Sequence, residues 1–338
     1  MIFGDRDATD QFDVFRCLAA ADGQEKWTVQ YPAPGKLDYG NTPRTTPLIH
    51  KSLVYLQGAF GDLHCLDAVT GTIKWSKNFQ RDFGATKDLP WGTCGSPLIA
   101  DGKLIINPGA EDASVVALDP QSGAELWSTP GHAPAYGSFL VGTFGGVRQV
   151  VGHDEVSLGG WAVEDGRRLW TLTPPKNDDF NVPTPVALGN RLLVTSENNG
   201  TRLYAFDGSG RIHNKPIAVN EEFAADVTTP TVVGGRVFGL WNDLFCLDAN
   251  QGLRTVWTYA DPSFHVHGTI IGSNDRLLVT GASGDLLLVD ATADPCRIVA
   301  RLQVFDYGNA ELYSHPAIVG QHLYVRGEDE IVCIDLAP

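Results

Sequence analysis

A ten-residue block recurs along this chain and restricts its fold more than any other feature of the sequence. In its full form, Leu-Asp is followed by a Gly four residues after the Asp and by a Trp four residues after the Gly. Copies of the block lie at 18–27, 66–75, 118–127, 161–170 and 247–257, with weaker copies at 206–210, 289–290 and 334–335. The tryptophans at 27, 75, 127 and 170 are 48, 52 and 43 residues apart. Eight copies at this period indicate a repeat architecture.

A second element precedes the block in each unit and predicts where the first strand of the unit begins. It is a Ser-Pro or Thr-Pro pair or its counterpart, as at Thr46-Pro47 and Ser96-Pro97. Short β-branched or aromatic runs bounded by Gly, Asn and Asp follow it, and no long helical period competes with them. We therefore expect four strands per unit, named A to D, with the block spanning C and D. Four short antiparallel strands in about 45 residues are typical of a β-propeller blade.

Each residue type that recurs in the block has a predicted structural role. The Asp ends strand C, where its carboxylate can accept hydrogen bonds from turn N–H groups. The Gly supplies the positive φ of a bulged hairpin turn. The Trp covers a large apolar area between one blade and the next. These structural positions are Asp67, Asp119, Asp248, Trp27, Trp75, Trp127, Trp170 and Trp257.

The predicted fold is an all-β propeller with eight blade positions in a single domain over 1–338. The expected blades are 1–31, 44–80, 92–130, 135–174, 182–220, 226–261, 265–307 and 313–338. The first blade starts in strand B and the last stops after strand C, so both are expected to be incomplete. We interpret this as a sign that the natural protein begins upstream of Met1.

The repeat blocks resemble those of the PQQ-like (pyrroloquinoline quinone repeat) β-propellers. That family includes the quinoprotein alcohol dehydrogenases and the assembly lipoprotein of the Bam complex. The resemblance covers nearly the whole chain and is specific for the fold, whereas the family mixes enzymes with scaffolds. It implies a bacterial protein in the periplasm or elsewhere outside the cytoplasm, although the sequence MIFGDRDATD is no signal peptide.

Composition narrows the range of partners. The chain has 40 Asp and Glu against 25 Lys and Arg, a net charge of −15. Nucleic acids and anionic membrane surfaces are bound through clustered Lys and Arg, so the charge argues against both. No apolar run approaches the roughly 18 residues of a transmembrane segment. We expect a monomer whose partner is a protein or a polymer.

The six cysteines favour a structural interpretation. Cys17, Cys65, Cys246 and Cys333 share one repeat position, directly before the Leu or Ile of strand C. Equivalent positions in different blades should lie beyond the roughly 7 Å limit for a disulfide, so we interpret these four as small buried hydrophobic residues. No zinc-ligand spacing is present, and a metal site at His265, His267 and His315 is left as an alternative to polar side chains around a wet channel.

The starts of the A strands provide the candidate ligand-binding residues. The residue before the Pro, or its counterpart, is a hydroxyl or imidazole in every copy, and residues two positions earlier lie on the same strand face. Since strand A is innermost in a propeller, both sets should lie at one mouth of the channel. These residues either hydrate the channel and bond the strand starts, or bind a ligand. With the nearby Trp91, the candidates are Arg44, Thr46, Ser96, Tyr136, Ser138, Thr184, Thr229, His265, His267, Tyr313 and His315.

Two classes of function follow from the resemblance. The first, which we favour, is a non-catalytic propeller that binds a protein, peptide or carbohydrate at one face. The alternative is a quinoprotein dehydrogenase that uses PQQ and calcium. Such enzymes carry an adjacent-cysteine disulfide, and this chain has no Cys-Cys pair. Arg44 is the only cation at the strand-A positions and no acidic loop has calcium-binding spacing, so we predict no catalytic residue, no cofactor and no metal.

Overall fold

The computed structural model describes residues 1–264, 267–305 and 312–337. The chain divides into two compact units. Unit 1 is Met1–Pro175 with Phe206–Ile212, and unit 2 is Lys176–Ala205 with His213–Pro338. Strands dominate both, and the described helices are one α-helix of five residues, α1 (Phe79–Phe83), and one 3₁₀ turn, η1 (Pro262–Phe264). The all-β prediction is therefore confirmed.

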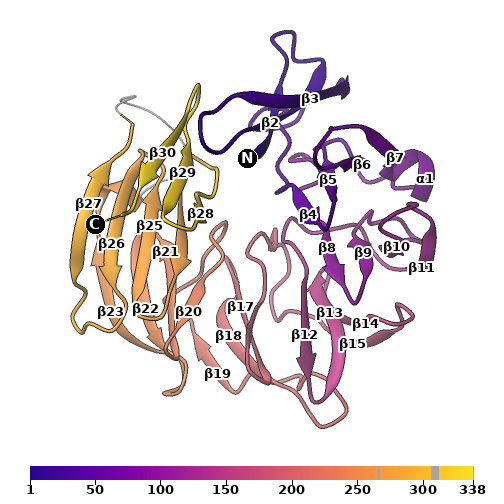
Figure 1. Ribbon diagram of the computed structural model, residues 1–338. Helices are drawn as coiled ribbons and strands as arrows, with labels where there is room; N and C mark the ends of the chain where they lie inside the picture. Colours follow the sequence, from indigo (N-terminus) through magenta and orange to yellow (C-terminus); the bar gives the residue numbers. More distant parts are fainter. Residues whose placement is uncertain (265–266, 306–311, 338) are drawn as a thin grey trace. The chain divides into compact units, whose positions relative to one another are not determined.

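Unit 1 contains four antiparallel sheets, each formed by strands that follow one another along the chain (Figure 1). The strands, in order, are β1 (Ile2–Arg6), β2 (Phe12–Leu18) and β3 (Glu25–Pro32); β4 (Leu48–His50), β5 (Leu53–Gln57), β6 (Asp62–Asp67) and β7 (Ile73–Asn78); β8 (Leu98–Ala100), β9 (Lys103–Ile106), β10 (Val115–Leu118) and β11 (Glu125–Thr129); β12 (Leu140–Phe144), β13 (Val147–His153), β14 (Leu158–Ala162) and β15 (Arg168–Leu172).

Unit 2 contains the other four antiparallel sheets, again built from consecutive strands. Its strands are β16 (Val186–Leu188), β17 (Arg191–Ser196), β18 (Gly200–Ala205) and β19 (Ala218–Asn220); β20 (Thr231–Val233), β21 (Arg236–Trp241), β22 (Asp243–Asp248) and β23 (Arg254–Ala260); β24 (Gly268–Gly272), β25 (Arg276–Gly281), β26 (Asp285–Asp290) and β27 (Ile298–Gln303); β28 (Ala317–Val319), β29 (His322–Arg326) and β30 (Ile331–Asp335).

The eight sheets are the eight predicted blades of a β-propeller. Six have four strands, while the first (β1–β3) and the last (β28–β30) have three. The N-terminal residues form strand B, paired with strand C from Ile2↔Cys17 to Arg6↔Asp13. The last blade consists of strands A, B and C, as predicted. The single-domain organisation over 1–338 stays a prediction.

The repeat block forms the same turn in successive blades. Asp67 accepts hydrogen bonds from the backbone N–H groups of Val69 and Thr70, and Asp119 and Asp248 bind their own turns in the same way. Gly71 has a φ of +71°, and the ladder between strands C and D shifts register between Cys65 and Leu66. The predicted capping Asp and bulged hairpin are both confirmed.

The repeat tryptophans join adjacent blades. Trp27, Trp75, Trp127, Trp170 and Trp257 all lie on the fourth-strand position of their blades, and four are buried while Trp75 is partly buried. Within each unit the indole N–H donates to a carbonyl in the C–D turn of the next blade. The pairs are Trp27 with Ala68, Trp75 with Pro120, Trp127 with Val163 and Trp257 with Ala293. Equivalent placement of these residues is confirmed.

The core of each unit lies between neighbouring sheets rather than at one centre. Phe15, Trp27 and Tyr31 of the first blade pack against Val54, Leu56 and Leu66 of the second. Phe238 and Trp257 pack in the same way with Leu277 and Val289 of the next blade in unit 2. This sheet-on-sheet burial holds the loops at the strand ends in place.

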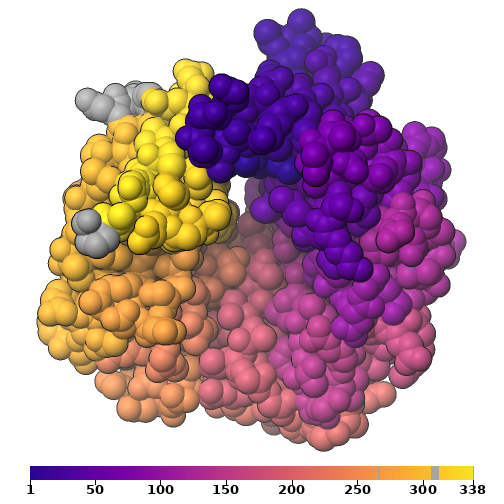
Figure 2. Space-filling model, in the orientation of Figure 1, coloured from indigo at the N-terminus to yellow at the C-terminus, as the bar shows by residue number. Residues whose placement is uncertain are grey.

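One cysteine differs from the prediction. All six cysteines are free, and Cys17, Cys65 and Cys246 are buried as expected, but Cys333 is exposed. The reason is its place on β30, the outermost strand of a three-stranded blade, where no fourth strand covers it. These C-terminal strands, yellow in Figure 2, form part of the molecular surface. The prediction of a buried residue was therefore wrong at Cys333.

Candidate functional site

The predicted row of hydroxyl groups connects one blade to the next. In unit 1 the backbone N–H of Thr46 donates to Ser96 Oγ, and that of Ser96 donates to Ser138 Oγ, both at 3.0 Å. In unit 2 the N–H of Thr184 donates to Thr229 Oγ1 at 3.0 Å. The hydroxyl at this position thus satisfies an N–H at the strand start of the preceding blade, which explains the residue type without a ligand.

The residues that the sequence placed two positions earlier form a different arrangement in unit 1. Arg44 donates from Nε to the Trp91 carbonyl at 2.5 Å and from Nη2 to the carbonyls of Asp38 and Gly40 at 2.7 and 2.9 Å. Its guanidinium therefore ties the loop between β3 and β4 to the loop before β8. A further bond, from the N–H of Asp38 to the Pro90 carbonyl at 2.8 Å, holds the same two loops together.

Three aromatic rings gather over this braced pair of loops. The rings of Trp91 and Tyr136 have centroids 4.5 Å apart and are tilted by 43°, and Tyr39 lies edge-on to Trp91 at 6.2 Å and 63°. We call Tyr39, Trp91 and Tyr136 the aromatic cluster. Burial raises the pKa of the Tyr136 hydroxyl, so this phenol is neutral at pH 7. Of the predicted candidates, the structure thus brings Arg44, Trp91 and Tyr136 together.

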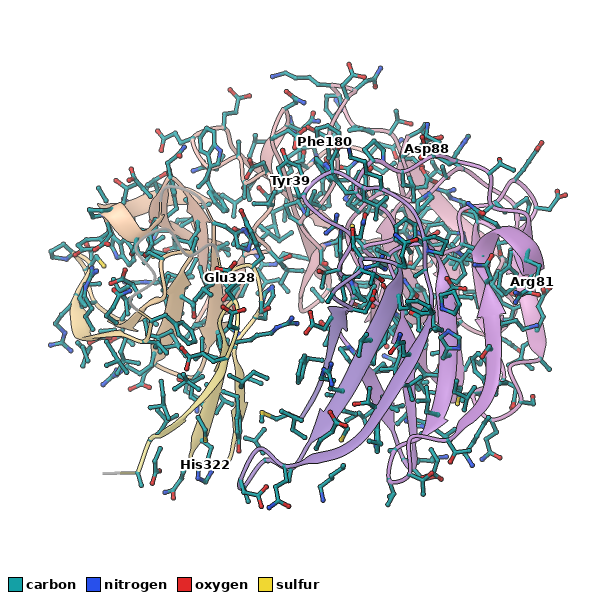
Figure 3. All side chains as sticks on the ribbon, turned by 90° about the horizontal axis from the view of Figure 1, so that it is seen from above. Tyr39, Arg81, Asp88, Phe180, His322 and Glu328 are labelled. Atoms are coloured by element: carbon teal, nitrogen blue, oxygen red, sulfur yellow. The ribbon has the colours of Figure 1, made fainter. Side chains whose placement is uncertain are left out.

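Tyr39 is the member of the cluster that sequence reasoning missed. It lies in the loop between β3 and β4, and 86% of its surface is exposed (Figure 3). Its φ is +63°, in the left-handed region that a bulky residue rarely occupies. The available signal was the loop itself, because a connection from Pro32 to Leu48 is longer than most and such loops are commonly functional.

Cys94 is partly buried next to Trp91, and its surroundings disfavour the reactive thiolate. Its Sγ is 3.4 Å from the carbonyl oxygen of Trp91. Burial raises the pKa of the thiol to about 11, although the nearby Arg44 charge opposes the shift. A thiol with that pKa is protonated at neutral pH, whereas the reactive form of cysteine is the thiolate.

In unit 2 the predicted imidazoles make a second small group. The rings of His267 and Tyr313 lie 5.4 Å apart. Burial, together with the charge of His315, lowers the pKa of His267 to about 4, so its ring is neutral at pH 7. His265 lies outside the described residues. Within the residues that are described, no three His, Cys, Asp or Glu side chains are grouped as metal ligands.

The most buried carboxylate of unit 1 belongs to a closed ion pair rather than to a site. Asp13 accepts hydrogen bonds from Tyr31 Oη at 3.0 Å and from Arg6 Nη1 at 2.6 Å. Burial raises the pKa of Asp13, and the bonds from Arg6 and Tyr31 oppose that shift. A Cβ at Gly58 would stand 2.3 Å from Asp13 Oδ2 and 2.5 Å from Tyr31 Oη. No substrate atom fits between these groups.

Fold and repeat together define the class of protein, a β-propeller built from PQQ-like repeats. The family model described as outer membrane protein assembly factor BamB matches residues 11–259, and the chain belongs to this family. Across the described residues, no helix combines the length and apolar character needed to cross a bilayer.

Two curated proteins are similar over part of the chain. The outer membrane protein assembly factor BamB of Burkholderia pseudomallei is 26% identical over 254 residues, which are 70% of this chain and 59% of that protein. The serine/threonine-protein kinase AfsK of Streptomyces coelicolor is 27% identical over 151 residues, 43% of this chain and 15% of the kinase. The chain thus spans less than two thirds of the length of either relative.

Solved structures share the fold at low sequence identity. BamB from Moraxella catarrhalis has a TM-score of 0.66 at 18% identity, covering 98% of this chain and 90% of its own. Quinohemoprotein alcohol dehydrogenase from Comamonas testosteroni has a TM-score of 0.63 at 12% identity, covering 94% and 68%. The computationally designed protein Ika8 also has a TM-score of 0.66, at 11% identity over 99% of this chain and 93% of its own. Membership of the BamB family supports a binding or scaffold role in general, and the dehydrogenase alternative has no better support.

Proposed function

We propose that this chain is a non-catalytic binding module that holds a polypeptide partner at the aromatic cluster of unit 1. The observation that carries the proposal is the arrangement of Tyr39, Trp91 and Tyr136 on loops that Arg44 braces through three carbonyls. Exposed aromatic side chains on a rigid support are typical anchors of protein interfaces, because they bury much area at little entropic cost.

The relatives favour a polypeptide over other partners. The similar protein of Burkholderia pseudomallei is named outer membrane protein assembly factor BamB, and the similar structure from Moraxella catarrhalis is also a BamB. An assembly factor of that kind binds protein chains, and it does so outside the cytoplasm. We extend both properties, binding of protein chains and a location outside the cytoplasm, to this chain. We also propose that it acts as a monomer and does not bind nucleic acid.

Binding to short peptides tests the proposal directly. Overlapping 15-residue peptides from an outer-membrane β-barrel protein are titrated against the chain by fluorescence anisotropy. At least one peptide is expected to bind, and Tyr39→Asn and Trp91→Ala are expected to weaken it by about tenfold or more. Val69→Ala is the matched control, since Val69 is exposed in the β6–β7 turn away from the cluster. The proposal would be refuted if Tyr39→Asn and Trp91→Ala both left peptide binding unchanged, as Val69→Ala should. It would also be refuted if an oligosaccharide bound and no peptide did.

The residues near the strand-A starts fit PQQ poorly, which supports a non-catalytic role. A quinone with three carboxylates needs cationic donors, and Arg44 already directs Nε and Nη2 at protein carbonyls. Calcium needs six or more oxygen ligands. We therefore expect no dye-linked alcohol oxidation after incubation with PQQ and calcium. Micromolar PQQ affinity by calorimetry, lost in Arg44→Ala, would instead favour the dehydrogenase.

A further inference from the structure

We infer that the aromatic cluster takes a basic side chain, arginine or lysine, from the polypeptide partner. The inference rests on the proposed function and adds the chemistry of the residue that is recognised. It depends on three observations: the geometry of the rings, the conformation in which Tyr39 is held, and the charges around the cluster.

The three rings present π faces in different directions within a small volume. Tyr39 and Trp91 are inclined by 63° with centroids 6.2 Å apart, and Trp91 and Tyr136 by 43° at 4.5 Å. A cation within about 6 Å of a ring centroid is attracted by the ring quadrupole, most strongly by Trp. A single guanidinium or ammonium group placed over Trp91 would therefore also lie near a second ring.

The backbone at Tyr39 indicates that its exposed ring has a use. Among the described residues with positive φ, Tyr39 and Leu253 are the two large side chains without an amide, carboxylate or amine group, at +63° and +60°. Leu253 is fully buried and its packing compensates for the strain. Tyr39 is 86% exposed and has no such compensation. Strained residues of this kind cluster at ligand-binding positions.

Charges of both signs lie around the cluster, and two carboxylates there are available to a cation. Asp38 directly precedes Tyr39, and its carboxylate acts on Tyr136 in the opposite sense to the larger effect of the Arg44 charge. Asp88 lies two residues before Pro90, whose carbonyl accepts the N–H of Asp38. Neither Asp38 nor Asp88 forms an ion pair within the described part of the chain, whereas Lys87 is paired with Glu155 at 2.9 Å.

Two cations also lie near the cluster, so the preference for a basic partner comes from the net charge of the chain. Lys36 is exposed in the same loop as Asp38, and the Arg44 guanidinium keeps its positive charge while Nε and Nη2 are engaged by three protein carbonyls. With a net charge of −15, the whole chain attracts basic partners and repels acidic ones. The site therefore suits a basic side chain better than an acidic or neutral one.

Paired peptides that differ in one charge provide the test. A peptide that binds in the array is synthesised with arginine, lysine, citrulline or norleucine at each of its basic positions in turn. Citrulline keeps the shape of arginine without its charge. At one position, arginine is expected to bind at least about fivefold more tightly than citrulline in calorimetry, the lower range for a partly desolvated cation–π contact.

Three variants locate the effect. In Tyr39→Asn, which keeps a residue tolerant of positive φ, the arginine–citrulline difference is expected to disappear, and in Asp38→Asn to shrink. Val69→Ala is expected to retain it. The melting temperature of each variant shows that a loss of discrimination is not a loss of folding.

The outcomes separate this inference from the proposed function. If arginine and citrulline peptides bind equally and Tyr39→Asn weakens both, recognition of a basic side chain is refuted, while polypeptide binding at the cluster stands. A preference for arginine that persists unchanged in Tyr39→Asn would also refute it, because the cation would then bind elsewhere. If no peptide binds at the cluster, the proposed function itself fails.

Discussion

The indole of Trp75 packs so closely on Gly123 of the next blade that a Cβ at Gly123 would stand 2.7 Å from Trp75 Cδ2. Trp27 meets Gly71 and Trp127 meets Gly166 in the same manner. The glycine of each of these three blocks is therefore required twice, by the positive φ of its own turn and by the tryptophan of the preceding block. The repeat motif is a contact between neighbouring blades as well as a local turn.

Gly123→Ala is expected to lower the free energy of unfolding by about 2–4 kcal/mol. Part of the loss, about 1–2 kcal/mol, comes from an L-residue at a φ of +69°. The rest comes from displacement of the Trp75 indole, whose N–H donates to the Pro120 carbonyl. Urea denaturation followed by circular dichroism measures the change.

Gly102→Ala is the matched control for Gly123→Ala. Gly102 also has a positive φ, +79°, but no atom lies within 4 Å of the position of an added Cβ. It should therefore show the backbone cost alone. Equal losses in the two variants would contradict a role for the indole contact.

A buried glutamine replaces the standard tryptophan contact at the fourth blade. Trp170 Nε1 donates to Gln149 Oε1 at 2.6 Å, and Gln149 Nε2 donates to the Gly210 carbonyl at 3.0 Å. Gln149→Leu leaves the indole N–H and this carbonyl without a partner, which should cost about 2–4 kcal/mol by urea denaturation. In a Trp170→Phe background the same substitution should cost less, because the indole N–H is gone. An unchanged cost would show that the bond from Trp170 to Gln149 contributes nothing to stability.

His64 is expected to make the protein less stable in mild acid. Burial, with a smaller contribution from the Arg81 charge, lowers its pKa to about 4, while an unfolded histidine has a pKa near 6.5. The unfolded chain therefore takes up a proton that the folded chain does not, and stability falls as the pH drops from about 6.5 through 4. Below pH 4 this contribution no longer changes.

The variant His64→Gln isolates that contribution. Between pH 7 and 4 the natural protein should lose about 3 kcal/mol more than the variant in urea denaturation. Glutamine can retain a hydrogen bond to Ser76 Oγ, which His64 Nδ1 contacts at 2.7 Å. The other acid-sensitive groups are the same in both proteins and cancel in the comparison. Stability curves that run parallel over this range would contradict the prediction.

The sequence predicts the fold because the repeat is local and regular. Asp67, Gly71 and Trp75 each have an interpretation within ten residues, and the structure confirms all three. The exceptions to this regularity are contacts between blades that residues outside the ten-residue block make. In blade 5, which lacks the tryptophan, Asn220 of β19 donates to the Leu253 carbonyl of the next blade at 2.8 Å, a pairing that no local pattern indicates.

The candidate site was predicted only in part, for a physical reason. Spacing identified Arg44 and Tyr136, because strand A fixes their repeat position, and it also identified the hydroxyls of Ser96 and Ser138. It could not show that those hydroxyls accept N–H groups of the neighbouring blade. It missed Tyr39 because the conformation of a long loop is set by tertiary bonds, here those of Arg44 to the carbonyls of Asp38 and Gly40.

Tyr39→Gly is expected to raise the free energy of unfolding by about 0.5–1 kcal/mol while weakening peptide binding. Glycine adopts a φ of +63° without steric cost, and the exposed ring contributes little packing to offset the strain. Leu253→Gly is the matched comparison, with nearly the same φ of +60° at a fully buried side chain. It should lower stability by about 2–4 kcal/mol, because a buried leucine is lost. A gain in stability at Tyr39 together with a loss of binding would show that strain is retained there for function. A loss of stability in Tyr39→Gly would instead assign the ring a structural role.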